Sequence, residues 1–347
     1  MTEKIKVAVL GAGGLGKAAA RIIGMKRELA LAAICDSQGL VASEEGLSGE
    51  LLAGLSGDLV ESYRRAAEGL SEASGGGVAV AAAVEAMHCA DPLGEMIARA
   101  DAYDAVLVAL PNLPNDFIPN VIARFARAGC SLVFTDVLKR TRAVEQMFAL
   151  EALVQDARSV VLTGCGATPG ILAAAAVLAA QSFIEVEKVD IWWGVGIANW
   201  ETYRATIRED IAHLPGYSVE RARAMSDAEV EALLARTHGL LTLSRMEHAD
   251  DLLLQRVGVV DRLDQVEVGG VMDTRHPKKP VSTTMTLTGI TVEGTRSSHR
   301  FVLGDETTMA ANVIGPALGY LKRGLWLKAH GLSGVFGCTE FLPMIVR

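Results

Sequence analysis

Cysteine is scarce in this sequence, and its spacing excludes two kinds of structural support. The 347 residues include five cysteines, which lie far apart and form no CxxC pair. A disulfide framework or a zinc ribbon needs closely spaced cysteines. The seven histidines also lack the spacing of metal ligands. We therefore expect buried, reduced thiols, no metal site and a cytoplasmic protein.

Long hydrophobic runs and an excess of positive charge are absent too. The longest apolar stretch, residues 170–180, is well short of the roughly 20 residues that span a bilayer, and the first residues carry no signal-peptide pattern. The net charge of -8 argues against nucleic acid and acidic membranes as partners. We expect a small-molecule substrate, no nucleic-acid or membrane partner, and a homodimer formed through strands of a second domain.

Alternating strand and helix signals fill the first 160 residues. They predict an α/β fold with an N-terminal Rossmann domain, a doubly wound sheet of parallel strands with helices on both faces. Strands are expected at 5–10, 29–35, 78–82, 105–110, 131–135 and 160–163, and helices at 14–25, 59–70, 92–99 and 118–128. The polar stretch 37–57 carries no assigned element, and 71–77 is expected to be a flexible connection.

The second half lacks this βαβ rhythm, which predicts an inserted α+β substrate domain at 161–305. Strands are expected at 186–193, near Val257 and Val266, and at 283–292 and 300–303. Helices are expected at 201–213 and after Ser226, which begins a capping-box pattern. A helix at 307–327, with Pro316 as a kink or break, is expected to return a C-terminal segment, 306–347, to the first domain.

A glycine-rich turn, Gly-Ala-Gly-Gly-Leu-Gly, joins the first strand to the first helix. Gly11 permits a tight turn, Gly13 lets the backbone approach a diphosphate, and Gly16 allows close packing of helix on strand. The helix opens at Gly14 and Leu15, where free amides and the helix dipole favour a negative charge. The turn therefore predicts a dinucleotide site.

An acidic residue after the second strand supports this interpretation. Asp36 lies 20 residues after Gly16, where a carboxylate binds both hydroxyls of the adenosine ribose and repels a 2′-phosphate. No Arg or Lys follows at 37–40, so NAD is favoured, with NADP as the alternative. A triphosphatase loop, the rival interpretation, fails at Ala18, because that loop needs Ser or Thr there to hold magnesium.

Other ligand contacts are expected at the carboxyl ends of the parallel strands, where open α/β sheets bind ligands. Lys139, after the fifth strand, is a candidate acid/base or a group that binds a substrate carboxylate. The alternative for Lys139 is a solvated helix start. The remaining candidate cofactor contacts are Ser37, Leu110, Pro111, Asn112, Asp136 and Gly166.

A second glycine-rich segment, Leu-Thr-Gly-Cys-Gly-Ala-Thr-Pro-Gly-Ile at 162–171, follows the first domain. Together with the glycine turn and the helix start at 307–312, it resembles the saccharopine dehydrogenase-like family. The resemblance implies hydride transfer between a nicotinamide and an amine or imine carbon, with Thr168, Pro169 and Gly170 beside the substrate. Relatives commonly have Asp where this chain has Thr168, so a carboxylate contact to the substrate amine is in doubt. A domain hinge is the alternative.

An amino-acid substrate would also need cations for its carboxylate. Arg204 and Arg208 have i,i+4 spacing on one helix face and could together clamp one carboxylate. Walls of the pocket could come from Trp192, Trp193 and Trp200, with core positions as the alternative. Pairing of Arg204 with Glu201 on the surface is the alternative. His213, His276 and His299 lie in the second domain and are candidate proton carriers, of which His213 is taken as the catalytic candidate; surface or core roles are the alternative.

Two other functions stay open. A dehydrogenase resembling the glucose-fructose oxidoreductase family would have the same domain plan and act on a hydroxyl. That family's Lys-Pro pair is missing here, since Arg140 follows Lys139. A non-catalytic Rossmann sensor or assembly subunit would bind NAD without turnover.

Overall fold

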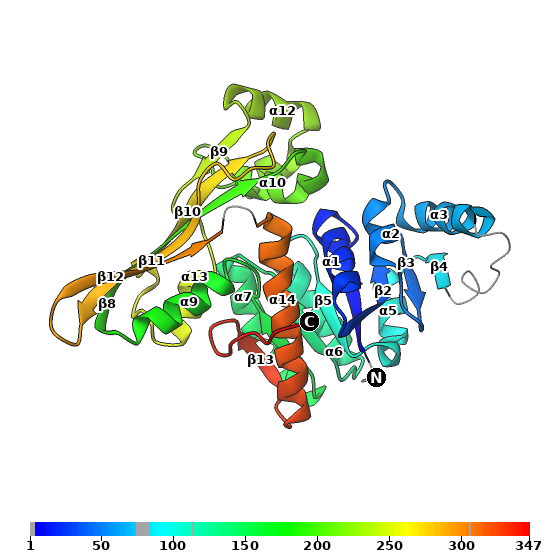
Figure 1. Cartoon of the computed structure of the whole chain (residues 1–347), viewed down its shortest axis with the longest axis horizontal. Coiled ribbons are helices and arrows are strands. Elements are labelled where there is room, and N and C mark those ends of the chain that lie inside the picture. Colours follow the sequence, from blue (N-terminus) through cyan, green and yellow to red (C-terminus); the bar gives the residue numbers. More distant parts are fainter. Residues whose placement is uncertain (1–3, 74–83, 113, 305–306) are drawn as a thin grey trace.

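The structure, a computed structural model, describes residues 4–73, 84–112, 114–304 and 307–347. Its elements form two sheets, an eight-stranded one that begins with the N-terminal strand and a five-stranded one built from the middle of the chain (Figure 1). Within the described ranges, no helix is both long and apolar enough to cross a membrane.

The first sheet has the strand order β13-β7-β6-β5-β1-β2-β3-β4. Its six strands from β13 to β2 are parallel, and most of their side chains are buried, as expected of strands covered on both faces. The strands are β1 (Ile5–Leu10), β2 (Leu29–Cys35), β3 (Gly39–Ser43), β4 (Val84–His88), β5 (Ala105–Val108), β6 (Val133–Asp136), β7 (Val160–Thr163) and β13 (Gly334–Gly337).

The polar stretch at 37–57, for which the sequence predicted no element, contains a strand and a helix. β3 turns back antiparallel onto β2 and is followed by α2 (Gly49–Gly54). This pairing buries Leu40 and Val41 completely, which explains why a short apolar run inside a polar stretch forms a strand. β4 then pairs antiparallel with β3 at the sheet edge. The strand predicted at 78–82 lies outside the described residues.

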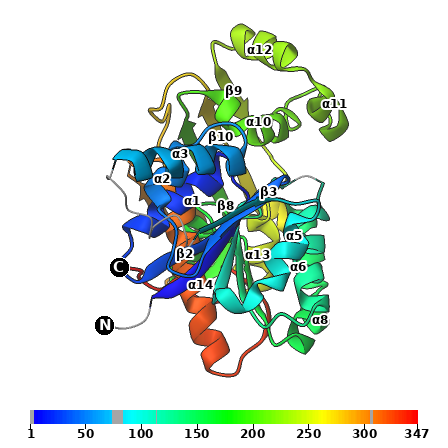
Figure 2. The ribbon, with the colours of Figure 1, turned by 90° about the vertical axis from the view of Figure 1, so that its right-hand side faces the viewer.

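Helices cover both faces of the first sheet (Figure 2). α1 and α14 pack together, and α14 also contacts β5, β6 and β7. Pro316 lies inside α14 without breaking it, so of the predicted kink or break, the break is wrong. The helices of this part are α1 (Gly14–Met25), α3 (Leu59–Ala73), α5 (Pro92–Ala98), α6 (Phe117–Arg127), α7 (Thr141–Phe148), α8 (Glu151–Asp156) and α14 (Met309–Ala329).

The second sheet has the order β12-β11-β8-β10-β9 and is mixed, since β10 runs parallel to β8 and the other pairs are antiparallel. α9 (Ile171–Ala180) packs against β8 and β11. The strands are β8 (Phe183–Gly196), β9 (Leu240–Leu243), β10 (Val266–Asp273), β11 (Thr283–Thr291) and β12 (Arg296–Leu303). The predicted fold class, a Rossmann-type sheet with an α+β second part, is confirmed.

Short helices connect the strands of the second sheet. They are α10 (Arg204–Ile211), preceded by a 3-10 turn at Trp200–Tyr203, then α11 (Val219–Ala224), α12 (Asp227–Arg236) and α13 (Asp250–Arg256). The predicted capping box at Ser226 is present at the start of α12. The strand predicted near Val257 is wrong: this residue caps the end of α13, because Gly258 with φ of 76° ends the helix.

Candidate active site

The glycine turn between β1 and α1 is a tight backbone bend with an open outer side. Gly11 has a φ of 105°, and a Cβ there would lie 2.5 Å from the carbonyl oxygen of Ala109. A Cβ on Gly16 would lie 1.8 Å from the carbonyl oxygen of Gly11, so helix and turn need glycine at both positions. A Cβ on Gly13 would meet no atom within 4 Å. Backbone amides there are accessible to a ligand.

A cleft, here called the outer cleft, runs over this turn along the carboxyl ends of β1, β2 and β5. It contains most of the residues that the sequence assigned to a dinucleotide. These are Gly11, Gly13, Gly14, Leu15, Asp36, Ser37, Leu110, Pro111 and Asn112. Gly16 is absent from the lining, because it packs the helix against the turn.

Asp36 is held in the outer cleft by its own loop. Its Oδ1 accepts hydrogen bonds from the backbone amides of Gln38, at 2.8 Å, and Gly39, at 3.0 Å. This side-chain turn fixes the carboxylate at the end of β2. Asp36 thus stands in the wall of the outer cleft.

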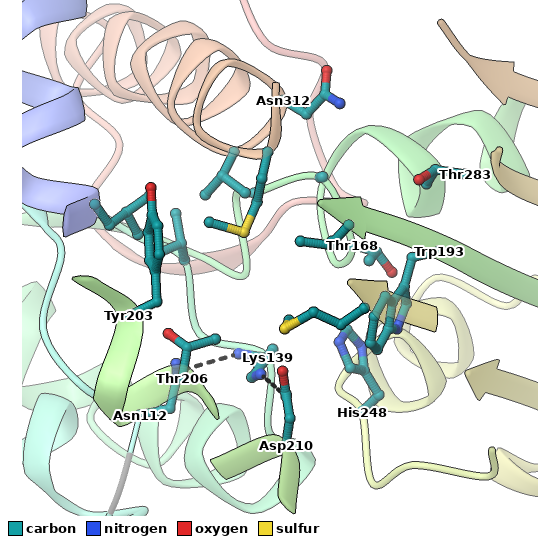
Figure 3. A pocket seen from close by; sticks show the side chains of 18 of the residues that line it. Asn112, Lys139, Thr168, Trp193, Tyr203, Thr206, Asp210, His248, Thr283 and Asn312 are labelled. Atoms are coloured by element: carbon teal, nitrogen blue, oxygen red, sulfur yellow. Dashed lines mark hydrogen bonds and ion pairs between the residues drawn. The ribbon is translucent and has the colours of Figure 1, made fainter. Parts of the chain in front are cut away.

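A second cavity, the inner cavity, lies between the two sheets and joins the outer cleft. The two share Leu15, Asn112, Val137, Tyr203 and Thr206. In the view of Figure 3, Asn112, Tyr203 and Thr206 stand on one side and His248 and Trp193 on the other, with Lys139 and Asp210 between them. Much of the remaining wall is apolar: Val195, Met246, Met272, Leu303, Met309 and Val313.

Lys139 brings a buried positive charge into the inner cavity. Its Nζ lies 2.8 Å from Asp210 Oδ1 and 3.4 Å from Glu209 Oε2, and the two carboxylate side chains are 2% and 3% exposed. Burial lowers the pKa of Lys139, but the two carboxylates outweigh burial and raise it above its ordinary value. The amine therefore keeps its proton. Burial raises the pKa of Glu209.

His248 and Asp250 form a buried pair that also belongs to this cavity. His248 Nδ1 lies 2.7 Å from Asp250 Oδ2, and the side chains are 3% and 0% exposed. Thr168 donates its hydroxyl to the same carboxylate oxygen at 2.6 Å. His248 and Thr168 line the inner cavity. The sequence did not indicate His248, because Thr168 is remote in the chain and the nearby Asp250 forms no recognisable motif with it.

Several predicted substrate residues have partners inside the protein. Arg204 and Arg208 converge on Asp227, at 3.0 and 2.5 Å, and both guanidinium groups lie over the Trp200 ring. Trp200 is buried and donates its Nε1–H to Glu231 at 2.9 Å. Arg204 borders the outer cleft, whereas Arg208 and Trp200 line neither cavity. The structure therefore does not bring this trio into the inner cavity.

His213 lies beside Arg140, with 3.4 Å between His213 Nε2 and an Arg140 nitrogen, and lines neither cavity. Burial lowers the pKa of His213 to about 4. A histidine with so low a pKa is neutral near pH 7 and has no access to a ligand in either cavity. The structure thus favours His248 over His213 as the histidine that meets a ligand.

Asp136 and the second glycine segment, residues 162–171, fix the local course of the backbone. Asp136 Oδ1 accepts hydrogen bonds from the amides of Leu138 and Gly164 and from the Thr163 hydroxyl. Burial raises the pKa of Asp136 to about 6, and its side chain lines neither cavity. The carboxylate instead ties β6 to β7.

Pro169 and Gly170 also lie outside both linings, while Gly166 and Thr168 line the inner cavity. Gly170 has a φ of 131°, and a Cβ there would lie 1.8 Å from the carbonyl oxygen of Gly166. The segment is a tight turn that positions Thr168 at the start of α9. Across the described ranges, no three His, Cys, Asp or Glu side chains gather in a way that could hold a metal ion.

Comparison with known proteins identifies one relative along nearly the whole chain. No protein-family model matches. The chain is 43% identical over 351 aligned positions to (S)-8-amino-7-oxononanoate synthase BioU of Haloferax mediterranei, with 98% of this chain and 99% of the relative covered. This finding overturns the expected membership of the saccharopine dehydrogenase-like family, which rested on two glycine-rich segments.

Two solved structures have the same fold. An engineered D-amino acid dehydrogenase bound to NADP+ has a TM-score of 0.55 at 14% identity, with 97% of this chain and 94% of that one covered. The DAP dehydrogenase of C. glutamicum in complex with DAP has a TM-score of 0.55 at 15% identity, covering 98% and 94%. At such low identity, these likenesses establish the fold alone.

Proposed function

Since the chain belongs to the (S)-8-amino-7-oxononanoate synthase BioU family, we propose that it is a nicotinamide-dependent oxidoreductase acting on an amino-oxo carboxylic acid. The relative's name makes such a compound its product. The observation that carries the proposal is the junction of the two cavities, where Leu15, Asn112, Val137, Tyr203 and Thr206 belong to both. A ligand along the outer cleft would present its inner end to the inner cavity.

The outer cleft fits a dinucleotide. Amides of the turn at Gly13 to Leu15, which is open at Gly13, would hold the diphosphate at the start of α1. Asp36 would accept hydrogen bonds from the adenosine ribose. When bound, a nicotinamide coenzyme supplies or accepts a hydride.

The charges of the outer cleft favour NAD over NADP. Asp36 lines it and would repel a 2′-phosphate, whereas Asp91, which also lines it, is paired with Arg124. The cation in its lining, Arg204, already pairs with Asp227 at 3.0 Å. A free guanidinium to bind the extra phosphate is therefore missing from this lining.

The inner cavity fits a substrate with a polar head and a carbon chain. Its apolar walls would cover methylene groups, whose burial contributes about 0.8 kcal/mol each. Lys139, which keeps its proton, would donate a hydrogen bond to an oxo or imine group whose carbon takes part in hydride transfer. Asp210 holds the amine of Lys139 in place.

Absorbance of reduced nicotinamide, followed with 8-amino-7-oxononanoate and related amino-oxo acids, tests the proposal. We expect NADH to bind and to be consumed or formed, at least 100-fold more slowly in Lys139→Met. Lys188→Met, which removes an exposed lysine between two carboxylates, is the matched control and should react like the unmodified protein. NADH binding without turnover across the panel would instead favour the sensor.

A further inference from the structure

The buried pair of His248 and Asp250 has no part in the function proposed above, yet it has the features of a binding group. Asp250 is fully buried, and its Oδ2 contacts His248 Nδ1 and the Thr168 hydroxyl. The other nitrogen of the ring, Nε2, makes no hydrogen bond within the described residues, and His248 lines the inner cavity. A polar atom that lies in a mostly apolar wall and has no hydrogen-bond partner in the protein is suited to bind a polar group of a ligand.

The chain fixes His248 relative to Lys139. The amide of Ala249, the residue next to His248, donates to the carbonyl oxygen of Lys139 at 2.8 Å. On either side of this bond, Arg140 pairs with Glu247, and the Thr141 hydroxyl donates to Asp251 at 2.9 Å. The segments 139–141 and 247–251 are therefore joined at three successive points. His248 and Lys139 enter the cavity from the same rigid junction, so both can meet one small polar head.

The charges around His248 and Lys139 determine which kind of substrate group His248 can bind. Asp210 and Asp250 contribute negative charge, and Lys139 is already paired with Asp210. A substrate carboxylate would meet further carboxylates, whereas a substrate ammonium would be attracted. A neutral imidazole accepts a hydrogen bond from an ammonium group, and Asp250 stabilises the imidazolium if the proton moves to Nε2.

We propose that His248, supported by Asp250, binds the amino group of the substrate while Lys139 meets the neighbouring oxo or imine group. This inference rests on the proposed function and assigns the amine subsite within it; the relative's name already places an amine and an oxo group on adjacent carbons. Proton transfer, where it occurs, converts the substrate ammonium to an amine and the ring to imidazolium, with no other bond changed. Asp250 acts as a positioning residue.

Binding of two ligands that differ only in the amine tests the proposal. The affinities of 8-amino-7-oxononanoate and 7-oxononanoate are measured by titration calorimetry without coenzyme, so that no turnover occurs. The unmodified protein should prefer the amine-bearing ligand at least 10-fold, as expected of one charge-assisted hydrogen bond. In His248→Ala and Asp250→Asn the preference should fall below about 3-fold, with binding of 7-oxononanoate nearly unchanged.

The protein contains a matched control on its surface. His276 lies 3.0 Å from Asp273, but its side chain is 71% exposed and lines neither cavity. His276→Ala should keep the full preference for the amine. NADH affinity reports folding in every variant, and His248→Gln, which retains a polar side chain, replaces His248→Ala if that protein does not bind NADH.

The outcomes separate the two proposals. Failure of the unmodified protein to bind NADH would refute the proposed function. NADH binding with equal affinity for the two ligands, or a preference that survives in His248→Ala and Asp250→Asn, would overturn the role of His248 alone. Loss of binding of both ligands by the same factor in these variants would also overturn it, because this is the effect of a purely structural pair.

Discussion

Replacement of Lys139 by Met should destabilise the fold strongly and with a defined pH dependence. The substitution roughly conserves volume but removes the cation that lies 2.8 Å from Asp210 and 3.4 Å from Glu209. Both carboxylates are buried, and breaking a buried ion pair costs about 3–5 kcal/mol. We expect the free energy of unfolding to fall by this amount at pH 7.

The sign of the pH effect follows from Glu209. Burial raises the folded-state pKa of Glu209 and Lys139 lowers it, so without Lys139 this pKa rises further above the unfolded value and the folded state binds the extra proton. Stability gained in this way is complete at low pH and is lost as pH rises through the raised pKa. The penalty should therefore shrink by up to about 1.4 kcal/mol per pH unit on acidification from pH 7 toward pH 5.

Urea unfolding at several pH values measures both effects. Lys188→Met is the control, because Lys188 also pairs with two carboxylates, Asp190 at 2.5 Å and Glu267 at 3.1 Å, but is 44% exposed. Its loss should change stability by no more than about 1 kcal/mol. The reasoning is refuted if Lys139→Met costs no more than Lys188→Met, or if its penalty grows on acidification.

Three further predictions follow from single contacts. Asp36→Ala should weaken NADH binding about 10-fold or more, through loss of charge-assisted hydrogen bonds, and improve NADPH binding; unchanged affinities in a fluorescence titration would contradict the ribose contact. The folded-state pKa of His213 is lowered from 6.5 to about 4, so on acidification between these values the unfolded chain takes up a proton first and the protein loses stability. In His213→Gln this acid-induced loss should disappear. Urea unfolding across this pH range measures the effect, and an unaltered pH slope would argue against a buried neutral ring. Ser226→Ala should cost about 1 kcal/mol, since Ser226 and Glu229 satisfy each other's amides at the start of α12; thermal unfolding would show no change if the cap were dispensable.

Local signals predicted the first sheet well. β1 and β2 begin and end at the predicted residues, because buried parallel strands are short apolar runs that need no knowledge of remote partners. The glycine turn and the capping box at Ser226 are also local. β3 escaped prediction because its burial depends on β2 and β4, and β13 because its partner, β7, lies far back in the chain.

The site shows the same division. The i,i+4 spacing of Arg204 and Arg208 correctly implies that both can reach one carboxylate, but that carboxylate is Asp227 of the protein itself. The sequence spacing of two residues determines whether their side chains share a helix face, but it does not identify the residues that pack against that face. His248, Asp250 and Thr168 meet only through the packing of α13 against α9, so their association needed the structure.

The position of β13 has a consequence for biosynthesis. The strand completes the first sheet beside β7, although the whole second sheet is synthesised between the two. A growing polypeptide therefore carries an unpaired β7 edge while the second sheet is made, and α14, which covers β5 to β7, also comes late. Open strand edges with uncovered apolar faces are prone to aggregation. Nascent chains that end before residue 334 should consequently depend on chaperones far more than the finished protein does.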